Sequence, residues 1–388
     1  MSVEHSGSRR HTEYVLFAAV VLCVASSFFM MDFVPDDSYI SYRYAENLAN
    51  GHGLRFNTEE QPVEGYSNLL WILLCAVFYL AGFDLPTAMP TVGVLLGVLN
   101  VTLLWILFRR RDLPPLQMLF PLLILASSGP FIMYEISGME MPLFSLLLLC
   151  LILRLDRVFT AARLIDYLLV AFVCVLLSLC RPEGIVSFPV TAVAVIWLKK
   201  RGETGCGDGR VVRNMSISFA AFVAIIAVYH VWRVGYFGEW LPTPLLSKGG
   251  GGKSVLYAWG ENLHYYFLKQ SDYFPPVGYY YAALIILAIT GLRFSRSEAA
   301  HRKSEVVTIV LVITYAVVYF NFRDWMPGMR YHSAYVGLML FPAVYVQGRF
   351  FESPETKRRM TPFWLIGIMA VVMNFGVLAQ LRVITKRA

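Results

Sequence analysis

Val34-Pro35-Asp36-Asp37-Ser38-Tyr39-Ile40-Ser41-Tyr42-Arg43 directly follows the first apolar run of the chain, residues 14–31. At 1.5 Å per residue, a helix over that run is about as long as the apolar core of a bilayer is thick. Two adjacent carboxylates at the end of a membrane span repel each other, so a cation, a metal ion or water must compensate their charge. The pair is either a solvated loop that ends the helix or the centre of a functional site. The other polar residues of the chain distinguish these two readings.

The composition is that of a membrane protein. Of the 388 residues 57% are hydrophobic and only 15% are charged, and apolar runs of membrane-spanning length recur along the whole chain. These features predict an all-α polytopic membrane protein, with the first run as a retained signal-anchor. The net charge of +7 does not indicate a nucleic-acid partner, because basic residues in this class mark cytoplasmic loops. The six cysteines show no C-x-x-C spacing, so neither a disulfide framework nor a zinc site is indicated.

The topology depends on the second apolar run, residues 66–83. If this run lies along the membrane surface, 21 of the 33 Lys and Arg residues fall in cytoplasmic segments; if it spans, only 12 do. The positive-inside rule favours the surface helix. We therefore predict about eleven transmembrane helices (10–12), with the N-terminus inside and the C-terminus outside. Apart from the first run, the predicted spans are 89–108, 115–134, 141–153, 167–180, 185–198, 215–234, 277–292, 306–322, 333–348 and 362–381.

This topology predicts a single transmembrane domain over residues 1–388 without a soluble C-terminal domain. The first outer loop, 32–83, holds the acidic pair and a juxtamembrane helix, and a long outer loop covers 235–276. A second surface helix is expected over 254–268. The middles of the predicted spans contain no Asp, Glu, Lys or Arg. Such a pattern is typical of a site at the membrane surface rather than a path through the membrane. The ionisable residues expected on the outer face are Asp36, Asp37, Glu64, Glu135, Glu140, Arg181, Glu183, Glu239, Lys248, Asp324, Arg330 and His332.

Several motifs on this outer face form one signature. The first loop holds residues 36–45 (DDSYISYRYA), Gly51-His52-Gly53-Leu54 and Val63-Glu64-Gly65-Tyr66-Ser67-Asn68. Later matches are Ser137-Gly138-Met139-Glu140, Arg181-Pro182-Glu183-Gly184, Gly238-Glu239-Trp240-Leu241-Pro242 with Lys248, and Asp324-Trp325-Met326-Pro327 with Arg330. Together they resemble the GT-C glycosyltransferases that use polyprenyl-phosphate sugars, in particular the terminal arabinofuranosyltransferases of actinobacterial cell-wall arabinan. The resemblance covers the membrane part only, since those enzymes carry an extracytoplasmic C-terminal domain.

The resemblance implies an inverting displacement at the anomeric carbon of a polyprenyl-phosphate-linked sugar. An Asp after the first span acts as general base on the acceptor hydroxyl, and we assign this role to Asp36. Asp37 then orients Asp36 or shares a divalent cation (Mg, Mn or Ca) with it, or it is simply the N-cap of the following helix.

Binding roles are expected for further residues of the signature. The candidates for the donor phosphate are Arg181, Lys248, Arg330 and His332, because a departing phosphate needs cationic stabilisation. The candidates for substrate contacts are Arg43, Glu64, Tyr66, Glu140, Glu239 and Asp324. Simpler roles stay open for most of them: ion pairs of Arg43 with Glu46 and of Arg181 with Glu183, a helix-dipole contact for Glu64, lipid headgroups for Lys248 and a backbone hydrogen bond for His332.

The sequence thus predicts an integral glycosyltransferase of a bacterial cytoplasmic (inner) membrane with its active site facing the periplasm. Its sugar is expected to be arabinofuranose, and its acceptor a glycan, a lipid or a pilin-like surface protein. One alternative is a hexose or aminoarabinose transferase with the same lipid carrier. Another is a flippase or transporter of lipid-linked sugars, although the chain lacks the mid-membrane charges and paired halves expected of a transporter. Membrane lipids are expected partners, and nucleic acid is not.

Overall fold

The structure is a computed structural model that describes residues 2–31, 33–161, 163–202, 208–244, 255–267, 277–321, 330–351, 371–372, 374–379 and 382. Every regular element within these ranges is a helix. The main bundle consists of α1 (Ser2–Met30), α4 (Leu85–Arg109), α5 (Pro115–Ser127), α6 (Gly129–Glu135), α7 (Met141–Thr160), α8 (Leu164–Cys180), α9 (Ser187–Gly202), α10 (Asp208–Phe237), α13 (Val277–Phe294), α14 (Ala299–Phe320) and α16 (Val336–Phe351). The remaining elements are α2 (Asp36–Ala49), α3 (Leu69–Leu80), η1 (Pro182–Val186), α12 (Val255–Phe267) and α15 (Arg330–Ser333).

Ten of the eleven predicted spans correspond to helices of this bundle, and the eleventh, 362–381, is described only at residues 371–372 and 374–379, which are helical. By length and composition, the described part of the chain contains five helices that could cross a membrane. They become six when α5 and α6, bent by 55° at Ser128, count as one broken span. The all-helical polytopic architecture is therefore confirmed, whereas the count of eleven stays a prediction.

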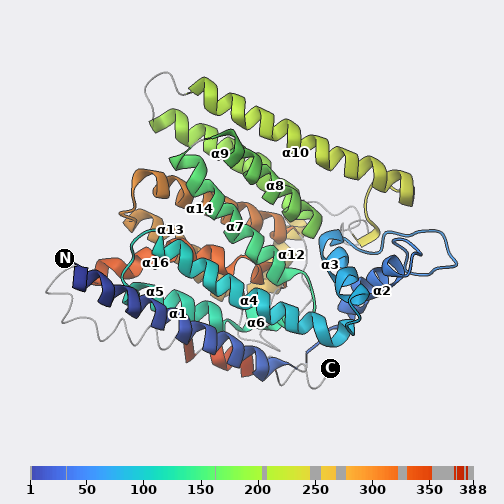
Figure 1. Ribbon diagram of the computed structural model, residues 1–388, viewed down its shortest axis with the longest axis horizontal. Helices are drawn as coiled ribbons and strands as arrows, with labels where there is room; N and C mark the ends of the chain where they lie inside the picture. Colours follow the sequence, from blue (N-terminus) through green and yellow to red (C-terminus); the bar gives the residue numbers. More distant parts are fainter. Residues whose placement is uncertain are drawn as a thin grey trace.

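The second apolar run forms α3, which has only 12 residues. It is about 18 Å long, well short of the roughly 30 Å apolar core of a bilayer. Figure 1 shows α3 beside α2, off one end of the long helices. One face of α3, with Trp71 and Cys75, is buried, and the opposite face exposes Leu73 and Val77. This arrangement agrees with the predicted juxtamembrane helix of the first outer loop.

Contacts between α1 and α4 determine which loops share an end of the bundle. Near the C-terminus of α4, Arg109 Nη1 donates to Thr12 Oγ1 at 2.7 Å and Trp105 Nε1 donates to the Thr12 carbonyl at 2.9 Å. Thr12 lies near the start of α1, and Asp36 follows the end of α1. The basic cluster after α4 and the acidic pair therefore lie at opposite ends of the bundle, as the predicted topology requires.

A buried charge network joins four helices at the end that carries Arg109. Arg111 donates to Asp156 at 2.9 Å and to Glu305 at 3.2 Å, and its guanidinium lies 4.3 Å from the ring centroid of Phe341. Tyr345 donates to Glu305 at 2.5 Å. Breaking the ion pairs between a buried guanidinium and two carboxylates is costly, because loss of one partner leaves an uncompensated buried charge. The network therefore ties the α4 end to α7, α14 and α16.

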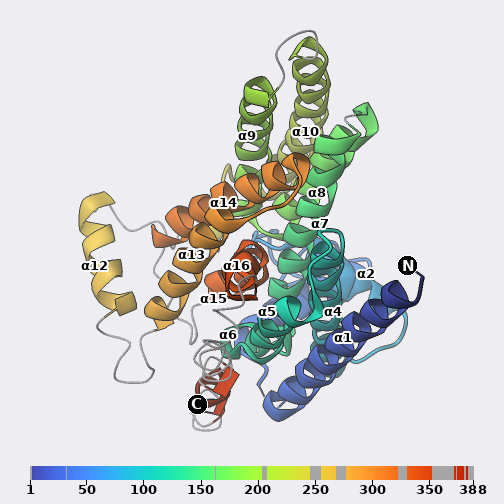
Figure 2. The same ribbon diagram turned by 90° about the vertical axis from the view of Figure 1, so that its left-hand side faces the viewer.

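Two predictions concern the outer end of the bundle, namely a surface helix over 254–268 and the position of Glu135. The surface helix is present as α12 (Figure 2). It is held in place by Trp259 Nε1, which donates to Asn321 Oδ1 at 2.8 Å. Glu135, also expected at the outer end of a span, lies at the end of α6 and is fully buried against α1 and α4. Ser27 Oγ donates to its carboxylate at 3.1 Å, and a Cβ on Gly97 would lie 2.0 Å from its Cδ. The bend after α5 directs this carboxyl group into the bundle, and a glycine of α4 provides the space.

Candidate active site: a pocket with paired charges beside α2

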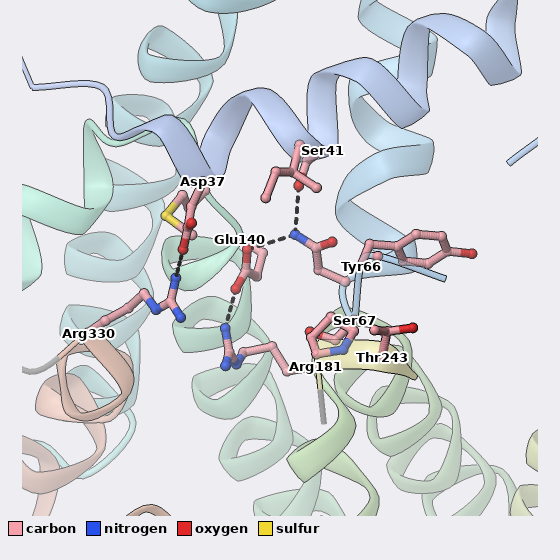
Figure 3. Close-up of a pocket in the computed structure, with 13 residues that line it drawn as sticks. Asp37, Ser41, Tyr66, Ser67, Glu140, Arg181, Thr243 and Arg330 are labelled. Atoms are coloured by element: carbon pink, nitrogen blue, oxygen red, sulfur yellow. Dashed lines mark hydrogen bonds and ion pairs between the residues drawn. The ribbon is translucent and has the colours of Figure 1, made fainter. Parts of the chain in front are cut away.

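A pocket of about 340 Å³ lies at the end of the bundle that carries α2. Figure 3 shows Asp37 and Arg330 at one end of this pocket, Glu140 and Arg181 in its middle, and the neutral side chains of Tyr66, Ser67 and Thr243 at the other end. The complete lining is Asp37, Ile40, Ser41, Gly65, Tyr66, Ser67, Asn68, Met139, Glu140, Arg181, Thr243, Pro244 and Arg330. Segments far apart in the sequence thus meet in one cavity.

The buried face of α2 is fixed against the turn that precedes α7. Ser38 Oγ donates to the Ser137 carbonyl at 2.7 Å, and Tyr42 Oη donates to the Gly138 carbonyl at 3.3 Å. Trp71 Nε1 of α3 donates to the same Gly138 carbonyl at 3.0 Å. Gly138 has φ +69°, and a Cβ there would lie 1.9 Å from Tyr42 Oη, so only glycine fits. These contacts set the rotation of α2 and hence the direction of its acidic first turn.

Of the two adjacent carboxylates, Asp37 faces the pocket. Arg330 Nη1 of α15 donates to Asp37 Oδ2 at 2.9 Å, and the side chains are 28% exposed for Asp37 and 5% for Arg330. Asp36 is exposed, does not line the pocket, and accepts a hydrogen bond from Asp37 N at 2.9 Å. Pro35 occupies the N-cap position of α2, so the side chain of Asp37 does not serve as that cap.

Arg181 and Glu140 form a second charged pair in the middle of the pocket. Arg181 donates to Glu140 and also to Glu183, which follows it in η1. Asn68 Nδ2 donates to Glu140 Oε2 at 2.9 Å and to Ser41 Oγ at 3.0 Å. Burial alone would raise the pKa of Glu140, but the positive charges of Arg181 and Arg330 and the hydrogen bond from Asn68 hold this pKa below its ordinary value. Glu140 is therefore ionised at neutral pH.

The two guanidinium groups share one aromatic ring. Arg181 Cζ lies 4.8 Å and Arg330 Cζ 4.9 Å from the ring centroid of Tyr331. Tyr319 stacks on Tyr331 with centroids 5.3 Å apart, and its hydroxyl donates to Glu183 Oε1 at 2.9 Å. Cation–π contacts are strengthened by desolvation, so this ring helps to hold both positive groups at the pocket. A pair of fixed guanidinium groups is suited to a phosphate.

Other predicted site residues lie outside the pocket lining. Arg43 is exposed and its Nε donates to the Phe56 carbonyl at 3.2 Å; Glu239 is exposed as well. Glu64 is buried and paired with Arg233. His332 packs in the aromatic cluster behind Tyr331, where burial lowers its pKa to about 3 and keeps it neutral. Lys248 and Asp324 lie outside the described residues. Roles for all of these in substrate binding stay predictions.

The sequence argument missed Asn68 and Tyr331 as site residues and overlooked Arg233. Asn68 stood in the signature of the first outer loop but was given no role, and Tyr331 gave no signal, because an aromatic residue is ordinary beside a membrane surface. Arg233 did carry a signal: it stands at the outer end of the predicted span 215–234, where the positive-inside rule disfavours arginine. Arg181, directly after the predicted span 167–180, stands at an outer helix end in the same way.

Within the described part of the chain, the side chains do not fit the divalent cation that the sequence left open. No group of three or more His, Cys, Asp or Glu side chains within the described ranges is placed to hold a metal ion. Both acidic side chains of the pocket, Asp37 and Glu140, are already paired with guanidinium groups. Because arginine compensates their negative charge, these two carboxylates in this arrangement do not offer a set of oxygen ligands for a divalent cation.

No protein-family model matches the chain, and no curated protein sequence matches it. Solved structures of the oligosaccharyltransferase of Archaeoglobus fulgidus do resemble it. The apo form matches with a TM-score of 0.58 at 12% identity, covering 96% of this chain and 56% of the other. A complex with an inhibitory peptide and a dolichol-phosphate matches with 0.59 at 11% identity, covering 96% and 55%. A complex with zinc and sulfate matches with 0.55 at 14% identity, covering 95% and 52%.

This chain spans about half the length of those oligosaccharyltransferase chains. At such low identity the likeness concerns the backbone arrangement alone, and it extends over nearly all of the present sequence. The chain therefore has an all-helical, GT-C-like membrane fold.

Proposed function

We propose that this protein is an integral-membrane glycosyltransferase that moves a sugar from a lipid-linked phosphate to an acceptor at the membrane surface. The observation that carries this proposal is the pocket beside α2. It brings a carboxylate, Asp37, next to the guanidinium group of Arg330, and the ring of Tyr331 packs against both Arg330 and Arg181. A base for an acceptor hydroxyl and cations for a leaving phosphate are the two groups that such a transfer needs.

In the proposed reaction, the acceptor oxygen attacks the anomeric carbon from the face opposite the phosphate. Its proton passes to a carboxylate, the bond between the anomeric carbon and the phosphate oxygen breaks, and the phosphate leaves with the electron pair. Arg330 and Arg181 stabilise the charge that develops on the phosphate. The sequence motif suggested Asp36 as the base. We now assign the base to Asp37, because Asp37 lines the pocket and Asp36 does not.

The finer assignment is a transferase for arabinofuranose carried on a polyprenyl phosphate. It rests on the resemblance of the first outer loop, and it places the pocket on the periplasmic face of a bacterial inner membrane. The pocket volume of about 340 Å³ is near the lower end of the range for ligand sites and suits a single sugar unit. Both lining carboxylates are paired with arginine, which favours a neutral pentose or hexose over an aminoarabinose. A glycan, a lipid and a pilin-like surface protein remain the acceptors to test.

A transfer assay with reconstituted protein tests this function. Vesicles that contain the protein would receive polyprenyl-phospho-arabinose labelled in the sugar, then its hexose and aminoarabinose counterparts, each with candidate acceptors. We expect label to move covalently to an acceptor with arabinose or hexose. Movement of intact labelled lipid across the vesicle membrane without any transfer would contradict the proposal and support the flippase alternative.

A further inference from the structure

The segment that follows α10 forms one wall of the pocket. Thr243 and Pro244 line the cavity at its neutral end, opposite Asp37 and Arg330 (Figure 3). The preceding residues have little packing of their own, since the side chain of Trp240 is 73% exposed and that of Leu241 is also exposed. This wall therefore needs an attachment to the rest of the molecule that its own side chains do not supply.

A buried ion pair provides the attachment. Arg233, near the end of α10, donates through Nη1 to Glu64 and through Nη2 to the carbonyl of Trp240. The backbone of Thr243 in turn donates to the Glu64 carbonyl at 3.2 Å. Glu64 precedes Gly65, which lines the pocket. One guanidinium thus joins α10, the first outer loop and the segment 238–244.

The surroundings make this attachment costly to break. The side chains are 3% exposed for Arg233 and 2% for Glu64. Aromatic rings pack beside the pair: Tyr66 lies 4.8 Å from Tyr44 and 6.0 Å from Phe237 between ring centroids. In such an apolar setting, removing one partner leaves the other charge buried and uncompensated. The ion pair therefore holds α10, the first outer loop and the segment 238–244 in one fixed arrangement.

We propose that Arg233 and Glu64 are positioning residues whose ion pair holds the segment 238–244 as a pocket wall, so that Thr243 contacts the sugar of the donor. This inference rests on the proposed function for its sugar. The wall supplies the hydroxyl group of Thr243, and the first outer loop supplies that of Ser67; both suit the neutral hydroxyl groups of a sugar. Glu64, expected from the sequence to bind substrate, acts instead through the wall.

Two readouts test the proposal. A nitroxide spin label at Thr243→Cys, in protein without other reactive cysteines, reports the mobility of the wall by electron paramagnetic resonance. Steady-state transfer assays in unlabelled protein report the KM for the donor and kcat separately. Both are measured in the wild type, Arg233→Met, Arg233→Lys and Glu64→Gln. The control is Arg111→Met, which breaks a buried guanidinium network at the opposite end of the bundle.

We expect the label to become mobile in Arg233→Met and less so in Arg233→Lys, which keeps the charge but loses the two-pronged donor. In the same order, the donor KM should rise, by about tenfold for Arg233→Met, which corresponds to about 1.4 kcal/mol. The kcat should change less than KM, because the reacting groups stay in place. Arg111→Met should leave the label immobile. If Arg233→Met does not fold, Glu64→Gln carries the same test.

An immobile label in both Arg233→Met and Glu64→Gln would overturn the attachment. A mobile label with unchanged donor KM would overturn the contact of Thr243 with the sugar. A wild-type protein that transfers no sugar from any donor would overturn the proposed function and, with it, this role of Thr243. The mobility measurement would still decide the attachment in that case, so the two failures are distinguishable.

Discussion

At the scale of single residues, phosphate binding is expected to depend on the planar shape of Arg330. Its guanidinium donates to Asp37 at 2.9 Å and to the Tyr331 hydroxyl at 3.0 Å while it packs against the Tyr331 ring. Lysine keeps the charge but offers no flat fork. We expect Arg330→Lys to weaken binding of a labelled polyprenyl phosphate about tenfold. Arg213→Lys, at an exposed arginine near the start of α10 and outside the pocket, is the control. Equal affinity in both variants would show that Arg330 does not hold the phosphate.

Glu140 should make the stability of the protein depend on pH. Its pKa in the folded protein lies below the ordinary value of 4.5, so its ionised form stabilises the fold above about that pH. The contribution is lost as the pH falls through the lower, folded-state pKa. We expect the wild type in detergent to lose this stability in acid, measured by thermal unfolding. Glu140→Gln keeps the shape of the side chain and should not show this loss of stability in acid. A variant with the same acid dependence as the wild type would contradict the assignment.

Sequence reasoning located the acidic pair but chose Asp36 as the base, whereas Asp37 is the member that lines the pocket. The choice depends on the rotation of α2, which is set by hydrogen bonds from Ser38 and Tyr42 to a turn almost a hundred residues away. Arg181 was identified as a candidate for the donor phosphate because a departing phosphate needs cationic stabilisation. Its second partner, Glu140, requires knowledge of how α7 and α8 lie beside each other, and local spacing carries no such information.

At the scale of elements, the close approach of α6 to α4 depends on Gly97. A Cβ there would lie 2.0 Å from Glu135 Cδ, so Gly97→Ala must displace α6 or the buried carboxyl group. We expect a loss of about 1–3 kcal/mol of stability from this overpacking, seen as a lower midpoint of thermal unfolding. Gly235→Ala is the matched control, since nothing lies within 4 Å of a Cβ on that glycine of α10. If Gly97→Ala unfolds at the same temperature as the control, the close packing described here is wrong.

The lengths of elements were easier to predict than their bends. The run 66–83 forms a helix too short to span, and the aromatic stretch 254–268 forms α12, because length and composition act locally. The run 115–134 was predicted as one span, and in the structure it breaks at Ser128 before Gly129-Pro130. Proline cannot donate a backbone hydrogen bond and disfavours a helical residue before it. The two helices then diverge by 55°, a direction that packing against α1 and α4 determines.

At the scale of the whole molecule, the two ends of the bundle should lie on opposite sides of the membrane. Single cysteines at Thr58, in the first loop, and at Arg110, beside the basic cluster, are both expected at exposed positions. An impermeant thiol reagent on intact spheroplasts, without other accessible thiols, should label Thr58→Cys and leave Arg110→Cys unlabelled. The reagent should reach Arg110→Cys after the cells are opened. Labelling of both positions in intact cells would contradict the proposed topology.

The segregation of charge between the two ends was predictable because the positive-inside rule acts on loops as a whole. The pairing of those charges was not. Arg111 was counted only as a cytoplasmic charge, yet it is buried between Asp156 and Glu305 from two other helices. Arg233 likewise stood unnoticed in an apolar run until the fold brought it to Glu64. Such pairs depend on helix order in space, which one sequence without its fold does not determine.

The most direct test of the proposed chemistry compares Asp37→Asn with Asp36→Asn in single-turnover transfer at saturating donor. General-base assistance contributes roughly 10²–10⁴-fold, and asparagine keeps the size of the side chain while it loses the base. With Asp37 as the base, Asp37→Asn should slow transfer by about that range while labelled polyprenyl phosphate still binds. The transfer rate of Asp36→Asn should fall far less, since Asp36 lies outside the pocket lining. Wild-type transfer by correctly inserted Asp37→Asn would contradict the assignment of this pocket as the catalytic site.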